Sequence, residues 1–465
     1  MRKLVIGAIA CILGIPVFAE GYQVNVLSAK QTGMGHVGTA MKLGAESMHF
    51  NPAGLVWLDN HMDISIGISA VSSQAKYSHE GYSAKTDNPL STPLYAYVGY
   101  KIYDNFAAGI SLTTPYGNSL KWPKNWAGVN VIQDIKLRSY VLQPTLSYKI
   151  TDKLSVGVGL MLAIGNVNLS RALMSTADFQ MIGTIIEGLP LPEEQKKYFV
   201  ETIRDNKFPP ASATLNGHAK VRAGFNIGIL YDVSDKVSIG LSYRSKIKMR
   251  VKEGDATLDY ANRNIEDLMG TLGKLAPAFA VPKYDQGSFR AELPLPSNTT
   301  LGVSYRPTDR WEMSLDLQYV GWNAYDSLNV YFNEEELGIN PIKANKDYKN
   351  TIIARIGAQY KATDRLDVRA GLYFDQSPIR KNNYNPETPG MNKIGMSAGL
   401  SFEPYQNLQF DFAFLYIQGI GRDGSYTYNN IVIPTQIDTF SGHYKSNAFT
   451  CLLYTSPSPR DVEES

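Results

Sequence analysis

The sequence predicts an all-β protein, a 14-stranded antiparallel transmembrane β-barrel. No window of about 18 consecutive apolar residues follows residue 19, so no α-helix of the sequence can span a bilayer. Segments of alternating polarity recur along the chain, and this pattern places one set of side chains on each face of a strand. Short polar turns also alternate with much longer connections, an asymmetry typical of outer-membrane barrels.

The composition agrees with this prediction once alternation is taken into account. The 465 residues have a mean hydropathy of -0.20 and 19% charged residues, which alone would suit a soluble protein. A strand that faces lipid on one side and a polar interior on the other has apolar and polar residues whose hydropathies cancel in such an average. The 29 tyrosines suit aromatic girdles at the membrane interfaces. A formal charge of +2 gives no argument for nucleic acid as a partner.

Both ends of the chain are set apart from the barrel. Residues 1–19 combine a basic start, an apolar run and the small-residue stop Val17-Phe18-Ala19, which predicts a signal peptide cleaved before Glu20. The alternative, a lipoprotein cysteine at Cys11, is disfavoured because the apolar run continues past it.

Residues 451–465 resemble a translated sequencing adapter, and we interpret them as an artefact that replaces the native end of the last strand. The alternative is a natural disordered tail. Without Cys11 and Cys451 the mature chain has no cysteine.

Alternation is clearest in four segments, at 154–164, 237–251, 311–319 and 408–416. A soluble β-sandwich would alternate in the same way. A repeated turn favours the barrel, because each copy is a tight polar turn that begins with an aromatic residue. Five copies and a degenerate sixth occur, at 100–106, 148–154, 231–237, 305–311, 360–366 and 402–408.

The six turns give twelve strands, as hairpins near 93–115, 136–170, 213–253, 284–324, 348–380 and 390–422. One strand before them, at about 62–77, and one after them, from about 437, make fourteen. The first strand must pair with the last, because an open sheet edge is not tolerated in lipid. The last strand would then be shortened or corrupted by the tail at 451–465. Long loops are expected near 170–212 and 254–284.

Asn51-Pro52-Ala53 stands just before the first strand, after a glycine-rich segment. The third-to-fourth strand region contains Thr114-Pro115-Tyr116-Gly117, Trp122, Trp126-Ala127-Gly128 and Leu142-Gln143-Pro144-Thr145-Leu146-Ser147-Tyr148. In these residues the chain resembles the FadL family of outer-membrane transporters, which includes toluene-channel relatives, over residues 20–450. The resemblance implies a small N-terminal helical hatch, residues 20–60, that plugs the barrel formed by residues 61–450. One departure is Val129-Asn130, where relatives often carry Arg-Tyr, so no ligand role is transferred there.

The resemblance also implies a route. Ligand is first captured in a groove of the upper loops and then enters the barrel near the hatch. A hatch rearrangement releases it sideways through a gap by the kinked third strand, around residues 106–117. Asn51, Pro52 and Ala53 are therefore hatch candidates, and Gly109, Pro115 and Gly117 suit a strand that bends and loses pairing.

A row of cations marks the seventh strand. Arg244, Lys246, Lys248, Arg250 and Lys252 alternate with a mainly apolar set. If that set faces lipid, the five cations face the lumen, where they would attract a carboxylate. The alternative is that they hydrate the lumen or pair with acids of the hatch and neighbouring strands. Arg355 and Arg369 are weaker candidates that face inward by the same rule.

The two long loops contain apolar stripes at helical spacing. Apolar helical faces on the water side of a barrel need cover, either from each other or from a ligand. Both interpretations stay open, and the ligand candidates are Phe179, Ile182, Ile186, Leu268, Met269 and Leu272.

Other motifs carry less weight. Gly33-Met34-Gly35-His36-Val37-Gly38 spells a dinucleotide fingerprint but does not follow a strand within a βαβ unit, so compact folding of the hatch is the better explanation. The six histidines are scattered and predict no metal site. No Gly-x-Ser-x-Gly elbow occurs, and a lipase or protease would have no nucleophile that we can name. We expect no cofactor and no enzymatic activity.

The sequence therefore predicts passive uptake of hydrophobic compounds, most of all long-chain fatty acids, across the outer membrane of a Gram-negative bacterium. The expected partners are a hydrophobic small molecule and outer-membrane lipid with lipopolysaccharide, and a monomer is expected. The alternatives are a general-diffusion porin, a structural or adhesive barrel, and a channel for aromatic hydrocarbons. A porin should lack the hatch.

Overall fold

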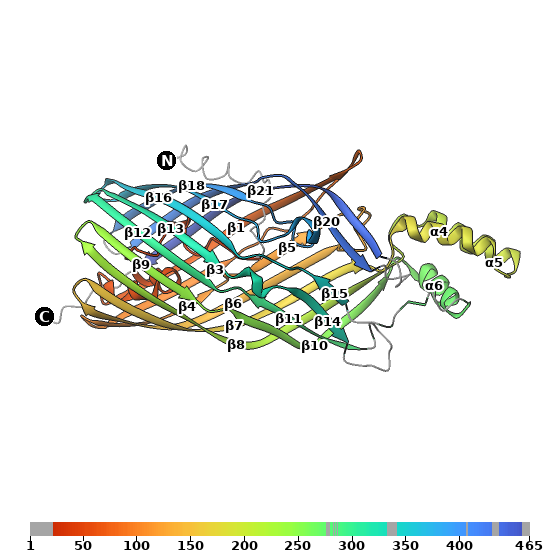
Figure 1. Ribbon diagram of the computed structural model, residues 1–465, viewed down its shortest axis with the longest axis horizontal. Coiled ribbons are helices and arrows are strands. Elements are labelled where there is room, and N and C mark those ends of the chain that lie inside the picture. Colours follow the sequence, from red (N-terminus) through yellow and green to blue (C-terminus); the bar gives the residue numbers. More distant parts are fainter. Residues whose placement is uncertain are drawn as a thin grey trace.

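The computed structural model describes residues 22–275, 280, 281, 283, 285, 287–332, 342–405, 408–429 and 437–457. The expected signal peptide and residues 458–465 lie outside the described residues. Antiparallel strands form one long closed barrel, with three helices projecting beyond one end (Figure 1).

Fourteen strands cross the barrel wall, and several of them are interrupted. The first seven are β1 (Met62–His79), β3 (Leu94–Tyr103), β4 (Phe106–Thr113) with β5 (Gly117–Lys121), β6 (Asp134–Thr151), β7 (Leu154–Ala172), β8 (Ala211–Ser234) and β9 (Val237–Arg244) with β10 (Ile247–Tyr260). The others are β11 (Ser288–Leu295) with β12 (Asn298–Thr308), β13 (Trp311–Val320) with β14 (Ser327–Phe332), β15 (Ile342–Asn345) with β16 (Thr351–Thr363), β17 (Leu366–Asp375), β18 (Lys393–Tyr405), β19 (Leu408–Gly419) with β20 (Arg422–Asn429), and β21 (Ile437–Pro457). Short elements at the wall are β2 (Tyr82–Lys85), η6 (Trp322–Ala324) and η8 (Lys381–Asn383).

The barrel closes between its first and last strands. β21 pairs with β1 from Ser78↔His443 to Ile66↔Thr455, and with β19 on its other side. The predicted fold class is thus confirmed. Within the described part the last strand is not shortened, because its pairing with β19 continues through Pro457, and Leu452 is buried while Leu453 is exposed. The origin of the tail stays a prediction.

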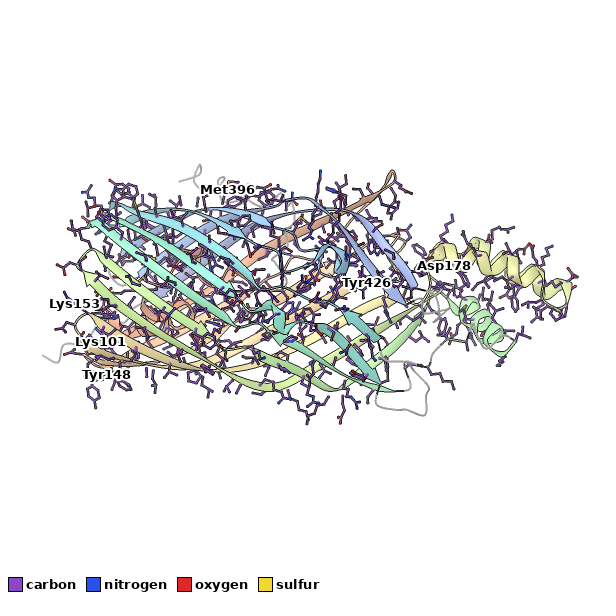
Figure 2. All side chains as sticks on the ribbon, in the orientation of Figure 1. Lys101, Tyr148, Lys153, Asp178, Met396 and Tyr426 are labelled. Carbon is purple, nitrogen blue, oxygen red and sulfur yellow. The ribbon has the colours of Figure 1, made fainter. Side chains whose placement is uncertain are left out.

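Side chains alternate between the lipid face and the interior. Apolar residues such as Leu241, Leu315 and Met396 are exposed, and Figure 2 shows Met396 on the outer surface. Their neighbours along each strand are buried, among them Ser242, Ser314 and Gly395. In the absence of water within a bilayer, exposed apolar side chains mark the surface that contacts lipid.

The hatch fills the end of the barrel that carries the short turns (Figure 1). Its helices are brief: α2 (Ala29–Thr32), η2 (Gly44–Glu46), α3 (Ser47–Phe50) and η3 (Pro52–Trp57). Most residues from 22 to 58 are buried. Part of the segment forms a small apolar cluster of its own, and residues such as Met48 and Leu55 pack on the inner wall. The turn residues Lys101, Tyr148 and Lys153 lie at this same end (Figure 2).

Three helices lie within the two long loops at the opposite end of the barrel. They are α4 (Thr176–Glu187), α5 (Glu193–Asp205) and α6 (Arg263–Leu275). Ser175 caps α4, with its Oγ accepting a hydrogen bond from the Asp178 N–H at 3.1 Å. None of the helices in the described part of the chain has the length and apolarity needed to cross a membrane. Long loops identify this end as the extracellular one.

Candidate functional site

Asn51 joins the hatch to the wall. Its side-chain amide donates to the carbonyl oxygens of Thr39, at 2.8 Å, and of Ile229 on β8, at 3.0 Å. Its Oδ1 accepts from the Ala53 N–H at 3.1 Å and so caps η3, which begins with Pro52. The Ala53 carbonyl accepts hydrogen bonds from the hydroxyls of Ser147 and Ser155. The Asn-Pro-Ala segment is therefore fixed by polar contacts to three wall strands.

Two glycines of the wall allow the Asn-Pro-Ala segment to lie this close to the strands. A Cβ atom on Gly228 would overlap Asn51 Oδ1, and one on Gly157 would overlap the Pro52 carbonyl. The glycine-rich segment is accommodated in the same manner, since a Cβ on Gly371 would overlap the backbone of Gly35. Gly35 itself has a φ of 69°, which favours glycine. These contacts place the GxGxxG run in the hatch, against the wall.

The third strand breaks at Thr114–Tyr116, between β4 and β5. Below the break β4 pairs with β3 and β6, and above it β5 pairs with β6 from Gly117↔Arg138. The first described hatch residues take up the backbone groups at the break: the Val24 N–H donates to the Pro115 carbonyl at 2.9 Å, and the Gly117 N–H donates to the Tyr22 carbonyl at 2.7 Å. The hatch is thus hydrogen-bonded directly to the interruption in the wall.

Gly109 does not belong to this break. It lies within regular β4, opposite Gly99, and a Cβ there would meet Met48 of the hatch. The interpretation of Gly109 as part of the bend is therefore wrong, because this glycine makes room for the hatch. Pro115 and Gly117 do lie at the break.

A cavity of about 420 Å³, here called the wall cavity, opens beside the break. On the interior side it is lined by buried residues of β17–β19, including Tyr373, Asp375 and Lys393. On the other side it is lined by the 89–94 segment and by Arg138, which is exposed. The wall cavity therefore reaches from the barrel interior to its outer surface.

A second, narrower cavity lies in the upper barrel and is here called the upper cavity. Its volume is about 80 Å³, the space of a few water molecules. Its lining is almost wholly apolar, with Leu137, Leu215, Met249 and Phe289 among the residues, and Tyr22 of the hatch also contributes. The two cavities share the lining residues Asn118, Leu137, Arg138 and Ser139. They are therefore adjacent along β5 and β6.

The predicted basic row is only partly inside the barrel. Arg244 is buried, but Lys246, Lys248, Arg250 and Lys252 are exposed on the outer face, while Ile247, Met249 and Val251 are buried. The lumen orientation of these four cations was predicted wrongly. The cause is an irregularity between β9 and β10, where Ser245 and Lys246 lie between the inward residues Arg244 and Ile247. One extra residue reverses the faces of the rest of the strand.

Arg244 is hydrogen-bonded to the hatch. Its Nη2 donates to the His49 carbonyl at 2.6 Å and lies 3.1 Å from His49 Nδ1. Burial, followed by the Arg244 charge, lowers the pKa of His49 well below its usual value, so the imidazole is neutral and accepts this bond. The contact supports the structural alternative for Arg244, pairing with the hatch.

Arg355 and Arg369 face inward, as expected. Arg369 pairs with Asp411 at 2.7 Å, and Arg355 donates to Gln318 at 2.5 Å. Sequence reasoning missed Lys393, which is 2% exposed and lines the wall cavity. Its parity with Gly395 and Gly399 on β18, opposite the exposed Ile394 and Met396, was the signal that could have identified it.

The six loop candidates are brought together, but in a closed cluster. Phe179, Ile182 and Ile186 of α4 pack with Leu268, Met269 and Leu272 of α6, and each is at most 4% exposed. Phe199 and Ile203 of α5 complete the cluster. In this arrangement the apolar faces of the helices cover one another. This supports the interpretation of mutual packing rather than that of an open groove. No group of three or more potential metal ligands occurs among the described residues.

The fold and its contacts define a transmembrane β-barrel that is plugged at one end and interrupted in its wall. The chain matches the model of the family described as "Outer membrane protein transport protein (OMPP1/FadL/TodX)" over residues 10–452, and it belongs to that family. It is accordingly an outer-membrane protein. The family consists of transport proteins, which supports the prediction that the chain is not an enzyme.

Two relatives illustrate the similarity in sequence. The "Long-chain fatty acid transport protein" of Escherichia coli (strain K12) is 22% identical over 432 residues, which cover 90% of this chain and 92% of the relative. "Outer membrane protein P1" of Haemophilus influenzae (strain Rd) is 22% identical over 425 residues, with 86% of each chain covered.

Solved structures show the same fold. A Pseudomonas aeruginosa FadL homologue superposes with a TM-score of 0.75 at 19% identity, covering 94% of this chain and 99% of that one. The Pseudomonas putida toluene transporter TodX gives a TM-score of 0.64 at 17% identity, covering 93% and 99%. The shared architecture confirms the fold that the family resemblance implied.

Proposed function

We propose that this protein mediates passive uptake of hydrophobic compounds, with long-chain fatty acids as the preferred ligands. The observation that carries the proposal is the wall cavity, which reaches from buried Tyr373 and Lys393 to the outer surface at the break in the third strand. A greasy molecule that leaves through the wall enters lipid without crossing water, whereas a solute for the periplasm would need an axial pore.

In the proposed route, ligand passes from the helices α4–α6 into the apolar upper cavity and then into the wall cavity through their shared lining. The helical cluster would have to part for Phe179 or Leu268 to touch ligand. The upper cavity is too small to hold a long acyl chain unless side chains move, so binding there is coupled to rearrangement.

The hatch would control the last step. Two backbone hydrogen bonds connect Tyr22 and Val24 to the break, and Tyr22 also lines the upper cavity. Ligand that displaces Tyr22 would weaken these bonds and widen the wall cavity. In contrast, the Asn-Pro-Ala segment is held by several hydrogen bonds to the wall, so we expect the 22–24 segment to move first.

Cations favour an acid over a hydrocarbon. Lys393 lines the buried side of the wall cavity, with Asp375 opposite it in the strand pairing, and Arg138 lines the exposed side. A carboxylate can form charge-assisted hydrogen bonds with such groups, whereas toluene gains nothing from them. The name of the E. coli relative supports the same choice, and that of TodX supports the aromatic alternative.

Flux measurements in reconstituted vesicles test the proposal. We expect labelled oleate to enter, no flux of a small hydrophilic sugar, and at least several-fold slower oleate entry in the Lys393→Met variant with little effect on toluene. Lys153→Met, at an exposed turn, is the matched control. Toluene flux without oleate flux would reassign the substrate to aromatic hydrocarbons.

Sugar flux without oleate flux would instead favour the general-diffusion porin. The buried hatch argues against that alternative, because it occupies the end of the barrel through which an axial pore would open. A purely structural or adhesive barrel would show neither flux.

A further inference from the structure

The exposed cations of β10 need an explanation other than the lumen. Lys246, Lys248 and Arg250 form a row on the outer surface, here called the outer basic row. Successive members are two residues apart, so the row extends over roughly 13 Å along the strand. Charged side chains on the lipid face are unfavourable near the bilayer midplane and are tolerated at its interfaces.

The row lies where the apolar surface ends. On β9 the outward residues Ile239 and Leu241 are exposed and apolar, and Lys246 comes nine residues after Val237, at which β9 begins. A lipid-facing band about 25 Å tall corresponds to roughly ten residues of a tilted strand. The outer basic row therefore begins at the upper edge of the band.

On the neighbouring strands, the outward residues change from apolar to polar level with the upper end of the row, near Arg250. On β7 the exposed Leu160 and Ile164 give way to Asn166, and on β8 the exposed Phe225 and Val221 give way to Lys220 and His218. Because β10 leads toward α6, this edge is the extracellular one (Figure 1). The upper end of the row is thus level with the head groups of the outer leaflet, and the long side chains of the two lysines below it can extend to the same level.

Charge around the row is predominantly positive. Arg250 pairs with Glu292 of β11 at 3.1 Å, and both side chains remain about half exposed, at 45% and 50%. Lys246 and Lys248 form no ion pair within the described residues. At the upper end of the row, Lys220 of β8 lies beside Arg250, and Arg290 of β11 lies one outward position beyond Glu292. Glu253 and Asp255 lie farther up β10.

We propose that the outer basic row is a binding site for the phosphates of a bisphosphorylated glycolipid, lipid A, in the outer leaflet. A row of this length can meet two phosphates at once, which a phospholipid with a single phosphate does not offer. Lysines near an anionic lipid surface gain Coulomb attraction in addition to the contact between acyl chains and the apolar band. Lys246 and Lys248 lie outside the transport route, because their side chains are on the outer face of the wall and line neither cavity.

Native mass spectrometry of the full chain in detergent, titrated with bisphosphoryl lipid A, tests this site. The double variant Lys246→Gln/Lys248→Gln is expected to bind roughly 25-fold more weakly, at about fivefold for each lysine removed. The matched control Lys153→Gln/Lys236→Gln removes the same charge from exposed turns at the periplasmic end and should bind as the unmodified chain does.

Lipid A without phosphates should bind the unmodified chain as weakly as bisphosphoryl lipid A binds the double variant of Lys246 and Lys248. Equal affinity of that variant and the unmodified chain would overturn the proposal, as would an equal loss in the control. Phosphatidylglycerol bound as tightly as bisphosphoryl lipid A would show that the row does not select a glycolipid. Oleate flux serves as the folding check, since both variants leave the lumen unchanged.

Discussion

At the scale of single residues, the hatch contains one carboxyl group in an unusual setting. Glu46 is buried and accepts hydrogen bonds from the hydroxyls of Ser28, at 2.6 Å, and Ser65, at 3.0 Å. Burial raises its pKa to about 7; these two hydrogen bonds and Lys30 lower it, and the nearby charge of Asp411 adds to the rise. A group with these properties makes the packing of the hatch depend on pH.

Because the pKa of Glu46 is raised in the folded state, its contribution is largest when the carboxyl is protonated. Stability is therefore expected to fall as the pH rises from about 4.5 toward 7, by up to about 3 kcal/mol in total. The apparent unfolding temperature in detergent should be lower at pH 8 than at pH 5.5. Glu46→Gln should reduce this difference, and an unchanged pH dependence in that variant would exclude Glu46 as its source.

At the scale of elements, the seam between hatch and β8 depends on the absence of a side chain. Gly228→Ala would place a methyl group where Asn51 Oδ1 lies, so the hatch must shift and lose hydrogen bonds, each worth about 1 kcal/mol. We expect faster proteolysis of the 22–58 segment and leakage of small solutes. Limited proteolysis and solute flux are the measurements.

Gly270→Ala is the control for that substitution. It lies on α6 with nothing within 4 Å of the added methyl group, and alanine in a helix is favoured over glycine by roughly 0.5–1 kcal/mol. A hatch as well protected in Gly228→Ala as in Gly270→Ala would show that the glycine does not determine hatch packing.

The strands also show which structural features sequence patterns can predict and which they cannot. Period-two alternation and the repeated turn predict the strands. The alternation is a local pattern, because each strand has lipid on one face and packed side chains on the other. The same rule fails for Lys246, Lys248 and Arg250, since an irregularity at Ser245–Lys246 reverses the faces and leaves no mark in composition. Gly109 was assigned to the bend for a different reason, namely that the residue it makes room for, Met48, is distant in sequence.

At the scale of the whole molecule, the candidate site is assembled from segments far apart in the chain. The wall cavity brings together hatch residues, the third-strand break and β17–β19. Pro115 and Gly117 were identified from the sequence because they interrupt a strand locally. The inward direction of Lys393 follows from its parity on β18, but its place in the wall cavity and the contacts of Tyr22 exist only once the barrel closes around the hatch.

We propose that movement of the hatch away from the third-strand break opens the route for the ligand. Gln23 and Tyr116 form an isolated antiparallel bridge, a geometry that a disulfide can span. Gln23→Cys/Tyr116→Cys in a Cys451→Ser background would therefore lock the hatch to the break. Ser425→Cys/Ser441→Cys, a paired position of β20 and β21, provides a lock that leaves the hatch free.

Oleate flux through the locked protein, measured before and after reduction of the disulfide, is the most direct test. We expect the disulfide between the hatch and the break to abolish oleate flux and its reduction to restore the flux. The disulfide between β20 and β21 should have no effect. Undiminished flux with the hatch locked would contradict it.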